Sequence, residues 1–155
     1  MSSLLRTVGW LSSIWGGLNA VYCIYRVIAA LLMLGRLARL DVAQREPAFG
    51  LTRGCIITTI VFYLIWCVLA ILTMRGGIDI LRRSNRSLLL VTHFPGAIAG
   101  VGLIGGITLL AFERLGAQAL AYMLGFGLAF VLGLALTIFN NFVLRQKKHR
   151  NELDA

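Results

Sequence analysis

Four long stretches of apolar residues restrict what this chain can fold into more than any other feature. They span residues 9–34, 54–74, 88–112 and 117–144. A helix crosses a bilayer core of about 30 Å with roughly 20 consecutive apolar residues, and a helix satisfies its own backbone hydrogen bonds in lipid. The pattern therefore predicts an all-α fold, in which residues 1–155 form a single integral membrane domain with a bundle of four transmembrane helices.

The composition agrees with this prediction. The chain is 59% hydrophobic and 14% charged, with a mean hydropathy of +0.85, whereas a soluble domain has about 25% charged residues. The connections between the apolar runs are short, and a short basic tail covers residues 145–155. The first run is too long for a signal peptide, and no small-residue cleavage site follows Leu34, so it is predicted to be a retained anchor helix. We expect any function to lie in or beside the bilayer.

The basic residues predict the orientation of the bundle, because Lys and Arg of short loops stay on the cytoplasmic side. Nine of them lie in the N-terminus, the second connection and the tail, and five lie in the first and third connections. Both termini are therefore predicted to be cytoplasmic. The arginines of the first connection oppose this orientation. Residues 34–44, which contain Arg36 and Arg39, are predicted to form a short interfacial amphipathic helix, which explains part of this opposition. The alternative is a first run that dips into the membrane, with the remainder of the chain inverted.

Small residues recur on the third and fourth apolar runs. In lipid they favour helix association, because they let two backbones approach closely. The connection between these runs is only residues 113–116, so the two helices are antiparallel neighbours. We expect them to pack closely along Gly96, Gly100, Ala121, Gly125, Ala129 and Gly133.

The first run carries a polar stripe made of Ser12, Asn19, Cys23 and Arg26, whose spacing places them on one side of a helix. Arg26 either snorkels to the membrane surface or docks against another helix or subunit. The three cysteines lie inside apolar runs without a paired motif, and we interpret them as packing residues. His93 precedes Pro95, so it is expected to help satisfy the backbone groups that the proline frees.

The sequence contains few residues for catalysis or transport. All six acidic residues lie in connections or the tail, and a proton-coupled transporter usually needs a carboxylate within the bilayer. No phosphate-binding, metal-ligating or nucleophile motif occurs. We therefore expect no cofactor and no metal, and we do not expect an enzyme.

The basic residues at the predicted cytoplasmic surface also predict a partner. We expect anionic lipid headgroups to contact Arg82, Arg83, Arg86, Arg145, Lys147, Lys148 and Arg150. Nucleic acid is not expected despite the net charge of +9, because no aromatic and basic recognition module is present.

Taken together, these features favour a non-catalytic accessory or scaffold subunit that packs against other membrane proteins or against itself. The alternative is a small oligomeric channel or transporter, and a lipid-modifying enzyme is a third class. The favoured location is a bacterial inner membrane, with an organellar membrane as the alternative.

Overall fold

The computed structural model describes residues 2–39, 53–84, 88–112 and 117–146. In these ranges the chain forms four helices and no strand. All four are long and apolar enough to cross a membrane, which is consistent with an integral membrane protein. The predicted all-helical bundle is confirmed. Its helices are α1 (Ser3–Arg39), α3 (Arg53–Leu81), α4 (Leu88–Phe112) and α5 (Ala117–Arg145).

The helix bounds differ from the apolar runs mainly in the first half of the chain. Helix α1 extends past both ends of its run, and α3 continues beyond Met74 to Leu81. An apolar run reports the length that suits lipid, whereas a helix continues for as long as its backbone hydrogen bonds do. The first part of the expected interfacial segment, residues 34–39, is the end of α1. Residues 40–44 lie outside the described residues.

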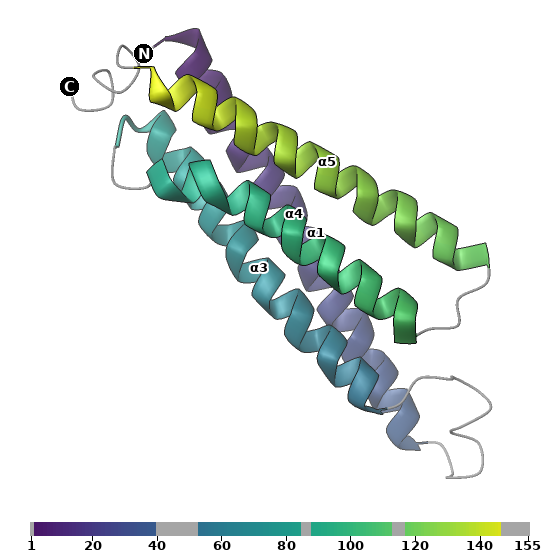
Figure 1. The fold of residues 1–155 in the computed structure, drawn as a ribbon. Coiled ribbons are helices and arrows are strands. Elements are labelled where there is room, and N and C mark those ends of the chain that lie inside the picture. The colour runs from purple at the N-terminus through teal and green to yellow at the C-terminus, as the bar shows by residue number, and fades with distance from the viewer. Residues whose placement is uncertain (1, 40–52, 85–87, 113–116, 147–155) are drawn as a thin grey trace.

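Consecutive helices pack side by side in antiparallel fashion, and the N-terminal end of α1 lies beside the C-terminal end of α5 (Figure 1). The contact between α1 and α3 is the most extensive. The contact between α1 and α5 is much smaller than those along the chain. Three apolar clusters fill the interior, and the central one includes Tyr63, Trp66 and Ile98. The bundle is therefore tightly joined along three edges and loosely joined along the fourth.

Glycines explain why α1 and α3 lie so close together. A Cβ atom added to Gly16 would lie 2.6 Å from the carbonyl oxygen of Ala70, and one added to Gly77 would lie 2.6 Å from the carbonyl oxygen of Gly9. Backbones that touch in this way gain dispersion contacts that lipid does not replace. This contact was not predicted from the sequence, although the spacing of four between Gly16 and Ala20 is a signal that indicates it.

Helices α4 and α5 use only part of the predicted ridge of small residues. A Cβ on Gly96 would lie 3.0 Å from Thr137 Oγ1, and a Cβ on Gly133 would lie 2.8 Å from the Cβ of Ala99. A Cβ on Gly100 or on Gly125 would meet no atom within 4 Å. Gly96 and Gly133 therefore lie at the contact between α4 and α5, whereas Gly100 and Gly125 are left open. The side chain of Ala121 lies outside the described residues.

Helix α3 ends in a turn that places the arginine cluster outside the bundle. Arg83 has a φ of 60°. Its N–H donates to the carbonyl of Ile80 at 3.0 Å, and the N–H of Ser84 donates to that of Asp79 at 2.9 Å. These bonds are those of a Schellman motif, which satisfies the last carbonyls of a helix. Arg82 and Arg83 are exposed as a result.

We expect Gly16→Ala to destabilise the fold by about 1–3 kcal/mol, the usual cost of overpacking, because its Cβ would collide with the backbone of α3. Gly127→Ala is the matched control, since its Cβ would meet no atom within 4 Å. Thermal unfolding in detergent would measure both. Equal melting temperatures for the two variants would contradict the glycine contact.

Candidate functional site

A groove of about 500 Å³ opens along the loose edge between α1 and α5. Its volume falls within the range of roughly 300–1,000 Å³ that is typical of small-molecule sites. The lining is mostly apolar and comes from three helices. It consists of Trp15, Leu18, Asn19 and Tyr22 of α1, Trp66 of α3, and Gly125, Phe126, Leu128, Ala129 and Leu132 of α5.

The groove exists because the two helices are joined at one end and carry small residues farther along. Near the N-terminal end of α1, Asn140 Nδ2 donates a hydrogen bond to Ser12 Oγ at 3.0 Å. Farther along α5, Gly125 has no side chain to reach α1, and a Cβ built there would meet no atom within 4 Å. Ala129, one helical turn away, adds only a methyl group. The small residues that were expected to pack against α4 thus line an open groove.

Aromatic rings form the inner wall of the groove. Trp66 is only 2% exposed. Its ring centroid lies 6.1 Å from that of Tyr22 and 6.0 Å from that of Phe126, and its ring stacks on Tyr63 at 5.9 Å with an interplanar angle of 10°. Aromatic pairs at such separations are mutually attractive. The wall is therefore held in place by rings from three helices.

Two polar atoms in this wall lack a partner. The indole Nε1 atoms of Trp15 and Trp66 are buried, and no hydrogen-bond acceptor among the described residues reaches them. Asn19 lies beside them, and its Nδ2 donates to the carbonyl of Trp15 at 2.8 Å. Leaving a buried donor unpaired costs free energy, and lipid supplies no acceptor in its place. Two of the residues that line the groove therefore carry a buried N–H without an acceptor among the described residues.

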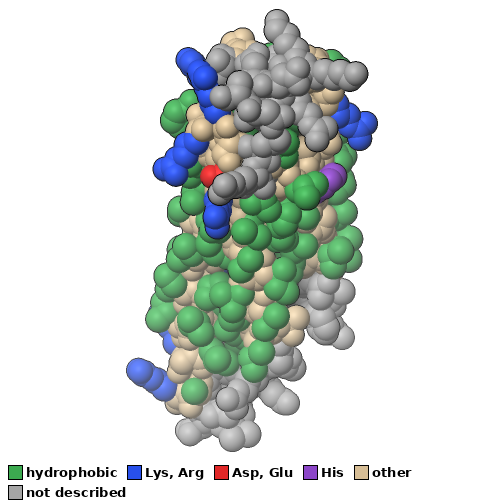
Figure 2. Space-filling view, turned by 90° about the vertical axis from the view of Figure 1, so that its left-hand side faces the viewer, with side chains coloured by type: hydrophobic (Ala, Val, Ile, Leu, Met, Phe, Trp, Pro, Cys, Tyr) green, Lys and Arg blue, Asp and Glu red, His purple; other side chains and the backbone are tan. Residues whose placement is uncertain are grey.

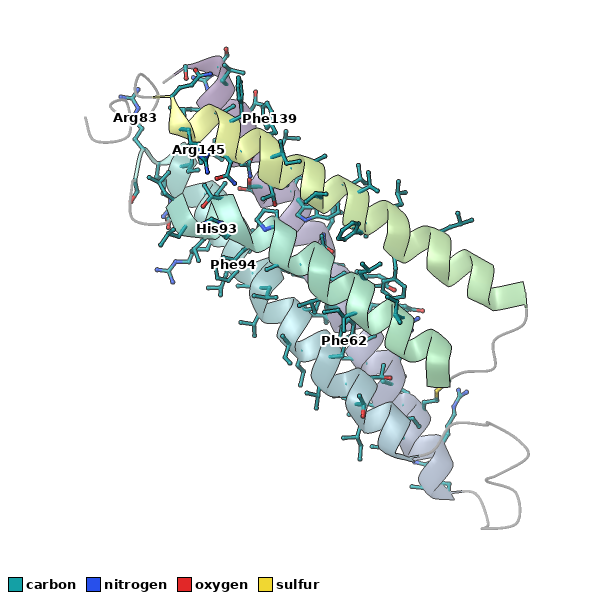
Figure 3. All side chains as sticks on the ribbon, viewed as in Figure 1. Phe62, Arg83, His93, Phe94, Phe139 and Arg145 are labelled. Atoms are coloured by element: carbon teal, nitrogen blue, oxygen red, sulfur yellow. The ribbon has the colours of Figure 1, made fainter. Side chains whose placement is uncertain are left out.

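A second polar cluster ties α5 to α4 at Pro95. Proline has no N–H, so the carbonyl four residues earlier, that of Val91, loses its helical partner. Asn140 Nδ2 donates to this carbonyl at 3.0 Å, and Asn141 Nδ2 donates to that of Thr92 at 2.9 Å. His93 is exposed and points away from the bundle core (Figure 3). The role expected of His93 is thus performed by Asn140.

The predicted polar stripe of α1 lies largely inside the bundle. Ser12, Asn19 and Cys23 are buried. Arg26 is half-buried, and its guanidinium carbon lies 5.3 Å from the centroid of the Tyr63 ring on α3. A cation over an aromatic face within about 6 Å is attracted to it. The structure thus gives Arg26 a contact with α3 of its own chain.

The basic residues lie toward the ends of the bundle. In Figure 2 hydrophobic side chains cover the length between these ends. Arg83 and Arg145 are exposed near the same end (Figure 3), as is Arg82. The remaining predicted lipid contacts lie outside the described residues: Arg86, Lys147, Lys148 and Arg150. No group of three or more metal-ligating side chains occurs in the described part of the chain.

Comparison of the chain with known protein families, with curated proteins and with solved structures finds no match. Its function must therefore be argued from the geometry of its own residues.

Asn140→Leu is expected to destabilise the bundle by about 1–2 kcal/mol, because it removes two hydrogen bonds and leaves the carbonyl of Val91 unpaired. Ser12→Ala should cost less, since it removes only one of these bonds. Unfolding in detergent would measure both variants and the double variant. A double variant that loses the full sum of the two effects would contradict their coupling.

Arg26→Leu is expected to lower stability by about 0.5–2 kcal/mol through loss of the contact with Tyr63. Arg26→Lys should retain much of it, because an ammonium group also interacts with an aromatic face. The same unfolding measurement in a Tyr63→Leu background provides the control. If Arg26→Leu is equally costly there, the contact with Tyr63 is not the source.

Proposed function

We propose that this protein is a non-catalytic accessory or scaffold subunit of a membrane complex, which packs against other membrane proteins or copies of itself. The observation that supports this proposal is an open stretch of small residues on the outer side of α4. Ala97 is exposed, and a Cβ on Gly100 would meet no atom within 4 Å. These small residues are therefore left open by the part of the chain that the structure describes.

Larger exposed side chains lie before and after this stretch along α4, and we call the two small residues the notch. His93 is exposed before it, and Ile104 is 67% exposed after it. Between them, Ala97 carries only a methyl group and Gly100 has no side chain. Transmembrane helices associate where small residues let their backbones approach. The notch therefore suits a transmembrane helix of another subunit.

The interior of the bundle also favours a structural role. The large side chains of Tyr63, Trp66 and Ile98 fill its centre. Asn140 and Asn141 donate to backbone carbonyls of α4, so they hold helices together. A solute path would need polar groups exposed along a continuous channel. This packing supports the scaffold role over transport through a single bundle.

The proposal places both termini in the cytoplasm of a bacterial cell, with the protein in the inner membrane. Arg82, Arg83 and Arg145 lie at one end of the bundle, where they would contact anionic headgroups. Arg36 and Arg39 at the end of α1 lie at the opposite end. The larger number of basic residues in the sequence falls on the first of these sides.

Labelling of single cysteines in a cysteine-free background would test this orientation. We expect residues 2 and 84 to react from the cytoplasm, and residues 44 and 118 to react from the other side. An impermeant maleimide applied to intact cells and to inverted vesicles would distinguish the two sides. Labelling of residue 44 from the cytoplasm, together with labelling of residue 84 from the outside, would show that the orientation is the opposite of the one proposed.

The scaffold role predicts that Gly100→Leu abolishes assembly, because a large side chain would hold the partner helix away from α4. The fold should not change, since the Cβ at this position would meet no atom within 4 Å. Purification in gentle detergent followed by native mass spectrometry would detect the assembly. Gly127→Leu is the matched control, because it adds the same side chain at an open position of α5.

Recovery of the unaltered protein as a monomer without partners, together with solute flux in liposomes, would contradict the scaffold role and favour transport. Assembly that survives Gly100→Leu would show that α4 does not form the interface.

A further inference from the structure

We propose that the groove between α1 and α5 binds a flat, apolar small molecule with a carbonyl group on its ring, the chemistry of a membrane quinone. This binding site goes beyond the scaffold role. It is built on different residues, because the notch at Gly100 belongs to α4 and the groove is lined by α1, α3 and α5. The two proposals can therefore fail independently.

The shape of the groove suits a flat ring. Its inner wall contains the ring of Trp66, whose centroid lies 6.1 Å from that of Tyr22 and 6.0 Å from that of Phe126. Gly125 leaves the outer side open, so nothing in the described part of the chain fills the space above it. A planar ring can pack against such a wall in an offset or edge-to-face arrangement.

The hydrogen-bonding groups of the groove require an acceptor from the ligand. An indole nitrogen can only donate, and the side chain of Trp66 is 98% buried with its Nε1 unpaired among the described residues. Trp15 Nε1 is also unpaired. The amide of Asn19 has a second N–H besides the one that donates to the carbonyl of Trp15. A carbonyl oxygen can accept from such donors without supplying a donor of its own.

The depth of these groups distinguishes such a ligand from an ordinary phospholipid. Asn19 lies about 20 Å along α1 from Arg6 and about 26 Å from Arg36, at 1.5 Å per residue. The ester groups of a phospholipid lie outside the hydrocarbon core of about 30 Å. A phospholipid would therefore bring only acyl chain to this depth, which leaves the donors unpaired. A ligand that carries its carbonyl within the hydrocarbon can reach them.

Binding also requires a small movement of Trp15. In the structure its Nε1 is covered by neighbouring atoms, so the ring must turn toward the groove to meet a ligand carbonyl. The open space at Gly125 leaves room for this turn on the α5 side, because a Cβ built there would meet no atom within 4 Å, whereas Trp15 now lies close to the tightly packed Gly133. The ligand carbonyl would then accept a hydrogen bond from Trp15 Nε1, which has no other acceptor among the described residues.

Equilibrium binding of radiolabelled 2-decyl-1,4-benzoquinone to the full chain in nanodiscs tests this proposal. Empty nanodiscs measure simple partition into lipid, and unlabelled decylbenzene serves as a competitor of similar shape without carbonyl groups. We expect saturable binding by the protein, and competition by decylbenzene at least about tenfold weaker than by unlabelled quinone, since every 1.4 kcal/mol is a factor of ten.

Two variants locate the site. Gly125→Leu fills the groove and should abolish saturable binding, whereas Gly127→Leu, outside the groove and equally open, should preserve it. Trp15→Phe keeps a ring but removes the donor, so it should weaken binding about fivefold to tenfold. Gly100→Leu should leave quinone binding unchanged, which separates this site from the scaffold interface.

Three results would overturn the proposal. Equal partition into nanodiscs with and without protein would show that there is no site. Displacement by decylbenzene as effective as by quinone would show that the groove holds plain hydrocarbon. Binding that survives Gly125→Leu would place the ligand elsewhere.

Discussion

The structure depends on the need to pair every backbone polar group where no water is available. A proline in a transmembrane helix violates this need, because it leaves a carbonyl without its N–H. In this protein Asn140 of α5 supplies the missing donor to Val91, and it also donates to Ser12 of α1. One amide therefore joins α4, α5 and α1. These bonds hold α1, α4 and α5 together at the end of the bundle where Ser12, Val91 and Asn140 lie.

The arrangement of the helices follows from where their backbones can touch. Gly9, Gly16 and Gly77 bring α1 against α3, and Gly96 and Gly133 bring α4 against α5. Between α1 and α5, the contacts found among the described residues gather near one end, where Asn140 bonds to Ser12 and Leu5 shares an apolar cluster with Val143. The edge between the first and last helices consequently remains open at Gly125. The groove is the space left between α1 and α5, because the contacts of α1 with α3, of α3 with α4 and of α4 with α5 are all more extensive than that of α1 with α5.

Two features of this arrangement bear on function. Ala97 and Gly100 of α4 are open, where they suit a partner helix. Trp15 and Trp66, which line the groove, each carry an N–H that finds no acceptor among the described residues. Without a partner, both features lower the stability of the protein. An uncovered helix face lacks dispersion contacts with another helix, and an unpaired donor lacks the free energy of a hydrogen bond. A subunit that assembles with other proteins and holds a ring-shaped ligand would recover both.

The sequence alone determined the helical class and the number of helices that are long and apolar enough to cross a membrane, because length and apolarity suffice for both. It also identified the stripe of Ser12, Asn19 and Cys23, since helical spacing is a local property. It could not say which small residues meet. Gly125 and Gly133 share one spacing on one helix, yet only Gly133 touches α4. That difference depends on how the helices cross and diverge. For the same reason only the tertiary structure paired Asn140 with the carbonyl that Pro95 leaves free, because these residues lie on different helices.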